Sequence, residues 1–241
     1  MLTKPSHYVA LASLLAACVV GYVFWKQRPA TPATEAYNPI IDPSNFVPHI
    51  NNKYFALIPG TKFTYEDTTG TLRIEVTVTN EKKKLMGVTT TGVRATEWRN
   101  GLLKHDTTDW YAQDRAGNVW DFGEAVDNYT DGKIVHHKGS WQAGVDGAKP
   151  GIIMPADPKV GETYRQEYYP GIAEDMGTVI AANRTVTVPY GTLKNCIQIQ
   201  DLTPFEPRRE YKYYCPDIAF LALEKLVGFG PEAELVSISR P

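Results

Sequence analysis

The chain has 241 residues, with 25 Lys and Arg against 27 Asp and Glu, and a formal net charge of -2 at pH 7. Proteins that bind nucleic acid usually carry a basic face, and no basic stripe is present, so nucleic acid is excluded as a partner. Three cysteines are too few for a disulfide scaffold and lack the close spacing of a zinc site, and phosphate-binding and dinucleotide-binding motifs are absent. We therefore expect no metal and no cofactor.

An uncharged segment near the N-terminus, residues 8–25, reads YVALASLLAACVVGYVFW. Its 18 residues are at the short end of what crosses a bilayer as a helix. Tyr8 and Trp25 suit the two membrane interfaces, and Lys26 ends the apolar run. The pattern predicts a transmembrane anchor that follows a short N-terminal tail, residues 1–7.

Two other interpretations of this segment stay open. Leu15-Ala-Ala-Cys18 resembles a bacterial lipobox, in which Cys18 is lipidated after cleavage, although the residues that follow Cys18 remain apolar. Small residues before Cys18 would also suit a cleaved secretory signal. In each case the membrane or the export machinery is a partner. We expect a single-pass protein of the cell membrane whose C-terminal domain lies outside the cytoplasm, in the periplasm or the extracellular space.

Residues 26–50 are rich in Pro, Ala and Thr and predict a linker. Residues 51–241 then predict one all-β domain. Leu72, Ile74, Val76 and Val78 alternate with polar residues as on a half-buried strand, and turn signals recur at hairpin spacing. We expect an antiparallel meander that forms a barrel or a strongly curved sheet, because closure hides the strand edges.

The central hairpin holds the most aromatic part of the chain, since four of the five tryptophans lie within residues 98–147. A three-residue loop at Arg115-Ala-Gly117, with Gly117 in the left-handed conformation, pairs Asp114 with Asn118. This register gives the hairpin an apolar face and a polar face. The apolar face holds Trp110, Ala112, Trp120 and Phe122, with Trp110 opposite Phe122, and the polar face holds Asp109, Tyr111, Gln113 and Asp121.

The polar face is the candidate ligand-binding site. Alternation of this kind is the usual pattern of an antiparallel sheet, so the simplest interpretation places Asp109, Tyr111, Gln113 and Asp121 on a solvent-exposed face. The functional interpretation is that Asp109 and Asp121 divide acid and base roles if their surroundings separate their pKa values. Asp106, His105 and Glu124 are further candidates at the ends of this face.

Residues 145–161 contain several Pro and Gly residues together with apolar Ile152, Ile153 and Met154. We expect a long irregular loop that folds over something. Farther on, the midpoint between Cys196 and Cys215 falls inside the turn at Thr203–Pro207, so a symmetric hairpin sets the two cysteines opposite each other. A directly opposed pair is close enough to bridge, which predicts a disulfide; two buried free thiols are the alternative.

Several motifs resemble a family of uncharacterised bacterial exported and lipoprotein β domains. They are Trp110-Tyr-Ala-Gln-Asp114, Gly117-Asn-Val-Trp120, Phe122-Gly-Glu124, Gly139–Ala148, Pro150-Gly151, Arg165-Gln-Glu-Tyr-Tyr169, Ala173-Glu-Asp175, Val188-Pro-Tyr-Gly191 and Pro204-Phe-Glu-Pro207. The resemblance implies an extracytoplasmic bacterial location and brings no reaction or ligand with it. Asp121 stands where an aromatic residue is expected, and the two cysteines are atypical.

Two functions follow. The first is a membrane-anchored binding or envelope-assembly domain whose barrel or cleft, covered by residues 145–161, holds an apolar or carbohydrate ligand; its partner would be a small molecule, a lipid or an envelope protein. The second is a hydrolase that uses Asp109 and Asp121. No catalytic motif is present, which favours the first.

Overall fold

The computed structural model describes residues 37–205, 209–226 and 233–241. Within them the chain is all-β and antiparallel, as predicted, apart from one 3-10 turn, η1 (Pro43–Asn45). The strands are β1 (Phe46–Val47), β2 (Ile50–Asn52), β3 (Phe55–Leu57), β4 (Lys62–Glu66), β5 (Leu72–Leu85), β6 (Val88–Arg99), β7 (Leu102–Asp114), β8 (Val119–Thr130), β9 (Lys133–His136), β10 (Trp141–Gln142), β11 (Lys149–Met154), β12 (Thr163–Arg165), β13 (Glu167–Tyr168), β14 (Met176–Val188), β15 (Gly191–Leu202), β16 (Glu210–Cys215), β17 (Phe220–Leu226) and β18 (Ala233–Ser239).

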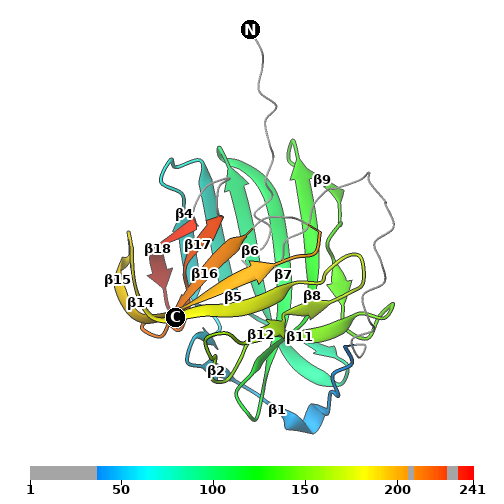
Figure 1. Ribbon diagram of the computed structural model, residues 1–241. Coiled ribbons are helices and arrows are strands. Elements are labelled where there is room, and N and C mark those ends of the chain that lie inside the picture. Colours follow the sequence, from blue (N-terminus) through cyan, green and yellow to red (C-terminus); the bar gives the residue numbers. More distant parts are fainter. Residues whose placement is uncertain (1–36, 206–208, 227–232) are drawn as a thin grey trace, which may run out of the picture.

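The sheet curves until its two ends meet, which gives a nearly closed barrel (Figure 1). Its strand order is β12-β14-β15-β16-β17-β18-β4-β5-β6-β7-β8-β11-β13. The two end strands, β12 and β13, are separated in the chain by Gln166 alone, so one short segment pairs with β14 on one side and β11 on the other. Gly151 of β11 makes this closure possible, because an added Cβ there would lie 2.3 Å from the Gln166 carbonyl carbon.

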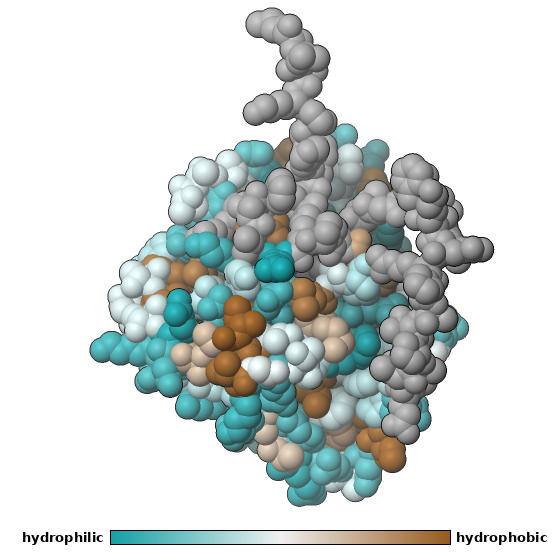
Figure 2. Space-filling model, viewed as in Figure 1, coloured by the Kyte–Doolittle hydropathy of each residue, from teal (hydrophilic) through white to brown (hydrophobic). Residues whose placement is uncertain are grey.

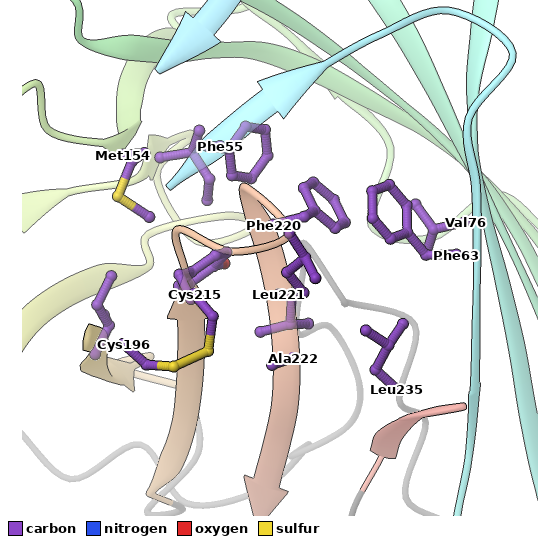
Figure 3. Close-up of a cluster of buried hydrophobic side chains, with 14 of the residues drawn as sticks. Phe55, Phe63, Val76, Met154, Cys196, Cys215, Phe220, Leu221, Ala222 and Leu235 are labelled. Carbon is purple, nitrogen blue, oxygen red and sulfur yellow. A yellow bond between two sulfur atoms is a disulfide. The ribbon is translucent and has the colours of Figure 1, made fainter. Parts of the chain in front are cut away.

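A single large hydrophobic core fills the space that the sheet encloses. The alternating residues of β5, from Leu72 to Val78, are buried in it as their period predicts. The short hairpin β2–β3 adds a plug, because the centre of the Phe55 ring lies 5.0 Å from that of Phe220 (Figure 3). The Phe55 ring also lies 5.3 Å from the Tyr111 ring. Phe63 stacks on Phe220 at 4.4 Å. Aromatic rings from distant segments therefore hold the plug and the barrel wall together.

A second, smaller core lies on the outer face of the sheet, over the central hairpin. Ala112 and Phe122 are buried in it, and Phe46 packs edge-on against Phe122 at 5.5 Å and against Trp120 at 6.4 Å. Residues 37–50, which were predicted to be part of the linker, therefore cover this outer core, and β1 pairs with the end of β7. The folded part of the chain begins before Asn51.

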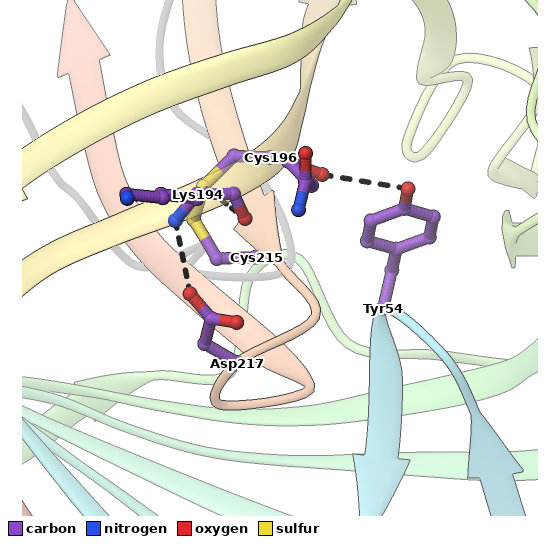
Figure 4. The surroundings of a disulfide bond; sticks show 6 residues. Tyr54, Lys194, Cys196, Cys215 and Asp217 are labelled. Atoms are coloured by element: carbon purple, nitrogen blue, oxygen red, sulfur yellow. Dashed lines mark hydrogen bonds between the residues drawn. A yellow bond between two sulfur atoms is a disulfide. The ribbon is translucent and has the colours of Figure 1, made fainter.

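The disulfide predicted between Cys196 and Cys215 is present (Figure 4). β15 and β16 pair in the expected symmetric register, with Gln198 opposite Tyr213, and this sets the two cysteines opposite each other. The backbone nitrogen of Lys194 beside the bond donates to Asp217 at 2.9 Å.

The expectation of an irregular loop over residues 145–161 is wrong for its middle part, which forms β11. Pro150 is the second residue of the strand, and Gly151 and Ile152 pair with Asp121 and Trp120 of β8. The carbonyl of Pro150 accepts a hydrogen bond from Tyr37 at 2.8 Å. Partners distant in sequence thus outweigh the local turn signals.

The predicted tail, residues 1–7, the predicted anchor, residues 8–25 with Cys18, and the first part of the linker lie outside the described residues. In the part of the chain that is described, no helix has the length and apolar character needed to cross a membrane. The face of the domain seen in Figure 2 mixes hydrophilic and hydrophobic residues. Scattered exposed apolar side chains of this kind are normal for a protein surface.

Candidate functional site

The four predicted site residues point into the barrel, and the expectation of a solvent-exposed polar face is wrong. Asp109 is 0% exposed and Asp121 is 2% exposed, while Tyr111 and Gln113 are also buried. The hairpin register that defined this face is confirmed at its tip: Gly117 has a positive φ of 99°, Ala112 lies opposite Trp120, and Tyr111 lies opposite Asp121. Alternation identified two faces, but only closure of the sheet decides that the polar face lies inside.

Gln113 is separate from the other three residues. Its side-chain oxygen accepts from the Asn51 backbone nitrogen at 2.8 Å, and its nitrogen donates to the Asn51 side chain at 2.8 Å. These bonds fix the β2–β3 plug to β7. The role of Gln113 is therefore structural.

A β-bulge at Gly123 changes the predicted register below the tip. Asp109 lies opposite Glu124, so Phe122 and Gly123 together oppose Trp110, which was expected opposite Phe122 alone. Gly123 has a φ of 144°, and an added Cβ would lie 2.7 Å from the Trp141 carbonyl oxygen, so no other residue fits there. The extra residue turns Glu124 to the same face as Asp121.

Carboxyl groups from distant segments meet at this place. Asp109 of β7, Asp121 and Glu124 of β8, Glu167 of β13 and Asp175 before β14 influence one another's ionisation. Pairing explains how they meet, because β11 sets Gly151 opposite Asp121 and Pro150 opposite Glu167. We call these five residues the acidic cluster.

One buried lysine lies beside the acidic cluster. The Lys212 ammonium is 2.6 Å from an Asp201 oxygen and 3.2 Å from a Glu210 oxygen. The other Asp201 oxygen accepts from the Gln166 side chain at 3.1 Å. Attraction from these carboxylates raises the pKa of Lys212 despite its burial, so the lysine is charged.

Burial is the main influence on the acidic cluster. It raises the pKa of Asp109, Asp121, Glu124 and Glu167 well above the ordinary values, and repulsion between neighbouring carboxylates adds to the effect for Asp109, Glu124 and Glu167. Burial raises the pKa of Asp175 to about 7. Burial therefore favours the neutral form of these carboxyl groups, and a neutral carboxyl group can donate as well as accept hydrogen bonds.

Unused hydrogen-bonding groups line the same interior. Among the described residues, both carboxyl oxygens of Glu124 and the hydroxyl groups of Tyr164 and Tyr214 have no hydrogen-bond partner. No group of three or more His, Cys, Asp or Glu in the described ranges is arranged to hold a metal ion.

A pocket of about 310 Å³ opens on the outer side of the sheet next to this cluster. Glu124 and Trp141 connect the pocket with the acidic cluster, because both residues line the pocket. Glu124 lies opposite Asp109 in the sheet, and the Trp141 indole lowers the pKa of Glu167. The other lining residues are Lys83, Trp110, Ala125, Ser140, Gln142, Val145, Asp146 and Tyr169. Val145 and Asp146, at the start of the segment 145–161 that was predicted to cover a cleft, form part of this lining.

The sequence alone identified Asp109 and Asp121, with Glu124 at the end of their face, but missed Glu167 and Asp175 as their neighbours. The available signal was the occurrence of both in the motifs that carried the resemblance. Their meeting depends on the Gly123 bulge and on closure of the barrel through Gln166, and no local pattern shows either feature. No family model, curated protein or solved structure matches the chain.

Proposed function

We propose that this protein is a membrane-anchored, extracytoplasmic binding domain, in which the barrel displays one ligand pocket. The pocket next to Glu124 and Trp141 carries this proposal. It combines aromatic rings with a few polar groups, and its volume lies at the lower end for small-molecule sites. Anchoring to the cell membrane rests on the uncharged N-terminal segment, residues 8–25.

The second candidate, a hydrolase that uses Asp109 and Asp121, has weaker support. Burial raises the pKa of both carboxyl groups, and neither is among the residues that line the pocket beside Trp141. A general base must reach its substrate within hydrogen-bonding distance. Glu124 is the one carboxyl group of the acidic cluster that belongs to the pocket.

Native mass spectrometry of the detergent-purified full-length chain tests the binding function. We expect a co-purified or added small molecule to be retained by wild-type protein and lost in Trp110→Ala. Trp98→Ala is the matched control, because Trp98 is also partly exposed but lies outside the pocket lining. Equal retention by both variants would refute the pocket as the binding site.

Asp109→Asn with Asp121→Asn separates the two candidates. A binding domain keeps its ligand in this double variant, since neither residue lines the pocket. A hydrolase loses turnover while its melting temperature is preserved. Turnover in wild-type protein that disappears in the double variant would replace the proposed function.

A further inference from the structure

The barrel closes through a short ladder between β11 and β13, which we call the seam. Within the described residues the seam has two residue pairs, Lys149 with Tyr168 and Pro150 with Glu167. Pro150 has no N–H group to donate, and its carbonyl oxygen also accepts from the Tyr37 hydroxyl at 2.8 Å. By contrast, β5 pairs with β6 along nearly all of its length. Local opening costs least where few backbone hydrogen bonds must break, so the seam can open while the longer ladders stay paired.

Acidic side chains meet at this seam. Glu167 belongs to the closing strand β13 and is 2% exposed. The residues that act on its ionisation lie on four other segments: Asp109 on β7, Asp121 and Glu124 on β8, the Trp141 indole on β10, and Asp175 before β14. Opening of the seam moves the carboxyl groups of β7 and β8 away from Glu167.

The closed seam is short of hydrogen-bond donors. In the described part of the chain, neither oxygen of Glu167, Asp109 or Glu124 has a hydrogen-bond partner. An ionised carboxyl group only accepts hydrogen bonds, whereas a protonated one also donates. A proton held on one of these groups supplies a donor to a neighbour and removes a repulsive charge. The packing of the closed seam therefore requires bound protons.

Asp175 connects the seam with the buried lysine. It faces Asp201 on β15, Glu210 and Lys212 on β16, and the Thr203 hydroxyl. The Lys212 ammonium lies 2.6 Å from an Asp201 oxygen and 3.2 Å from a Glu210 oxygen, so these two carboxylates take up most of its charge. Burial, with repulsion from Asp201, raises the pKa of Asp175 to about 7.

Closure of the seam binds protons. Burial, together with repulsion from Asp175, Asp121 and Asp109, raises the pKa of Glu167 well above its ordinary value. Opening returns Glu167 and Asp175 to water and to their ordinary pKa values, so the open seam releases protons that the closed seam holds. Closure is therefore fully favoured below about pH 4, and this advantage is lost as the pH rises through the raised pKa values.

We propose that the seam is a proton-operated latch, which closes when Glu167 and Asp175 are protonated and opens when they ionise. The open latch admits water to the acidic cluster and to Lys212, while the barrel wall from β4 to β8 stays intact. The latch acts on the interior of the barrel and is independent of the ligand pocket, so failure of either proposal leaves the other standing.

Hydrogen–deuterium exchange of the detergent-purified full-length chain tests the latch. After correction for the intrinsic exchange rate at each pH, amides of residues 149–154 and 163–168 should lose protection between pH 5 and pH 7, by about tenfold per pH unit for each proton released. Amides of residues 72–78 in β5 should keep their protection, because that strand is paired on both sides. Equal protection of the seam at both pH values would overturn the proposal. A parallel loss in β5 would also overturn it, since that result shows global unfolding.

Glu167→Gln tests the group that operates the latch. Glutamine has nearly the same size, stays neutral and can donate hydrogen bonds, so protection of the seam at pH 7 should be at least tenfold higher than in wild type. Adding Asp175→Asn should remove the remaining pH dependence. Glu81→Gln is the matched control, because Glu81 is an exposed carboxylate on β5, and its seam should open with pH as in wild type.

Melting temperatures establish that each variant is folded. If Glu167→Gln does not fold, Asp175→Asn alone takes its place, and its seam should open at a higher pH than the seam of wild type. A folded Glu167→Gln or Asp175→Asn variant whose seam opens over the same pH range as wild type would overturn the assignment of the latch to these groups.

Discussion

Removing the Lys212 ammonium should destabilise the domain strongly. The lysine side chain is 5% exposed and contacts Asp201 and Glu210, which are themselves 8% and 13% exposed. Lys212→Met keeps a long apolar side chain in place and removes only the charge. Deleting one partner of a buried ion pair leaves the other charge without compensation, which costs about 3–5 kcal/mol. In a chain of this size that loss lowers Tm by roughly 6–20 °C.

The loss of stability in Lys212→Met should depend on pH, and the ionisation of Asp201 determines whether the loss grows or shrinks as the pH rises. Without the lysine the pKa of Asp201, already raised by burial, rises further. Below that pKa the Asp201 carboxyl group is neutral, and the variant carries no uncompensated charge. The difference in free energy of unfolding between wild type and Lys212→Met is therefore largest near pH 8 and shrinks toward pH 5.

Urea denaturation of both proteins at pH 5 and pH 8 measures this difference. Lys62→Met is the control, because Lys62 pairs with Glu75 at 3.1 Å but its side chain is 42% exposed, so its loss should cost less than about 1 kcal/mol. Adding Asp201→Asn to Lys212→Met should recover part of the stability at pH 8. A Lys212→Met variant within 1 kcal/mol of wild type at pH 8 would refute the buried charge described above.

Three further predictions concern stability. Cys196→Ala with Cys215→Ala opens a loop that spans 19 residues, and on the chain-entropy model urea denaturation should show a loss of about 3 kcal/mol; no change would argue against that model for this pair. In wild-type protein, burial raises the pKa of Asp175 to about 7, so the folded state binds protons that the unfolded state releases above about pH 4. The free energy of unfolding should therefore fall as pH rises from 5 to 8, and Asp175→Asn should flatten this slope; an unchanged slope would exclude Asp175 as a cause. Asp114→Ala removes the acceptor for Asn118 and for the Trp120 indole, so Tm should fall by several degrees, and an unchanged Tm would show that the hairpin tip does not need these bonds.

Local features of the fold were predictable because their causes are local. The hairpin at Gly117 follows from a turn that needs a left-handed residue, and Cys196 and Cys215 pair because the midpoint between them falls inside one turn. The candidate site was only half predictable. Asp109 and Asp121 share a face by alternation, whereas Glu124 joins them through a bulge that depends on the close approach of Trp141 to Gly123.

The sequence by itself determined an all-β antiparallel chain, its central hairpin and its disulfide, since side-chain period and turn chemistry act over a few residues. Only the tertiary structure decided which face of the hairpin is inside. The sheet closes through Gln166 and encloses Asp109, while residues 37–50 cover the opposite face at Trp120. Burial and the resulting pKa shifts depend on that closure. A pattern within one hairpin cannot show it, because the strands and segments that complete the enclosure are distant in sequence.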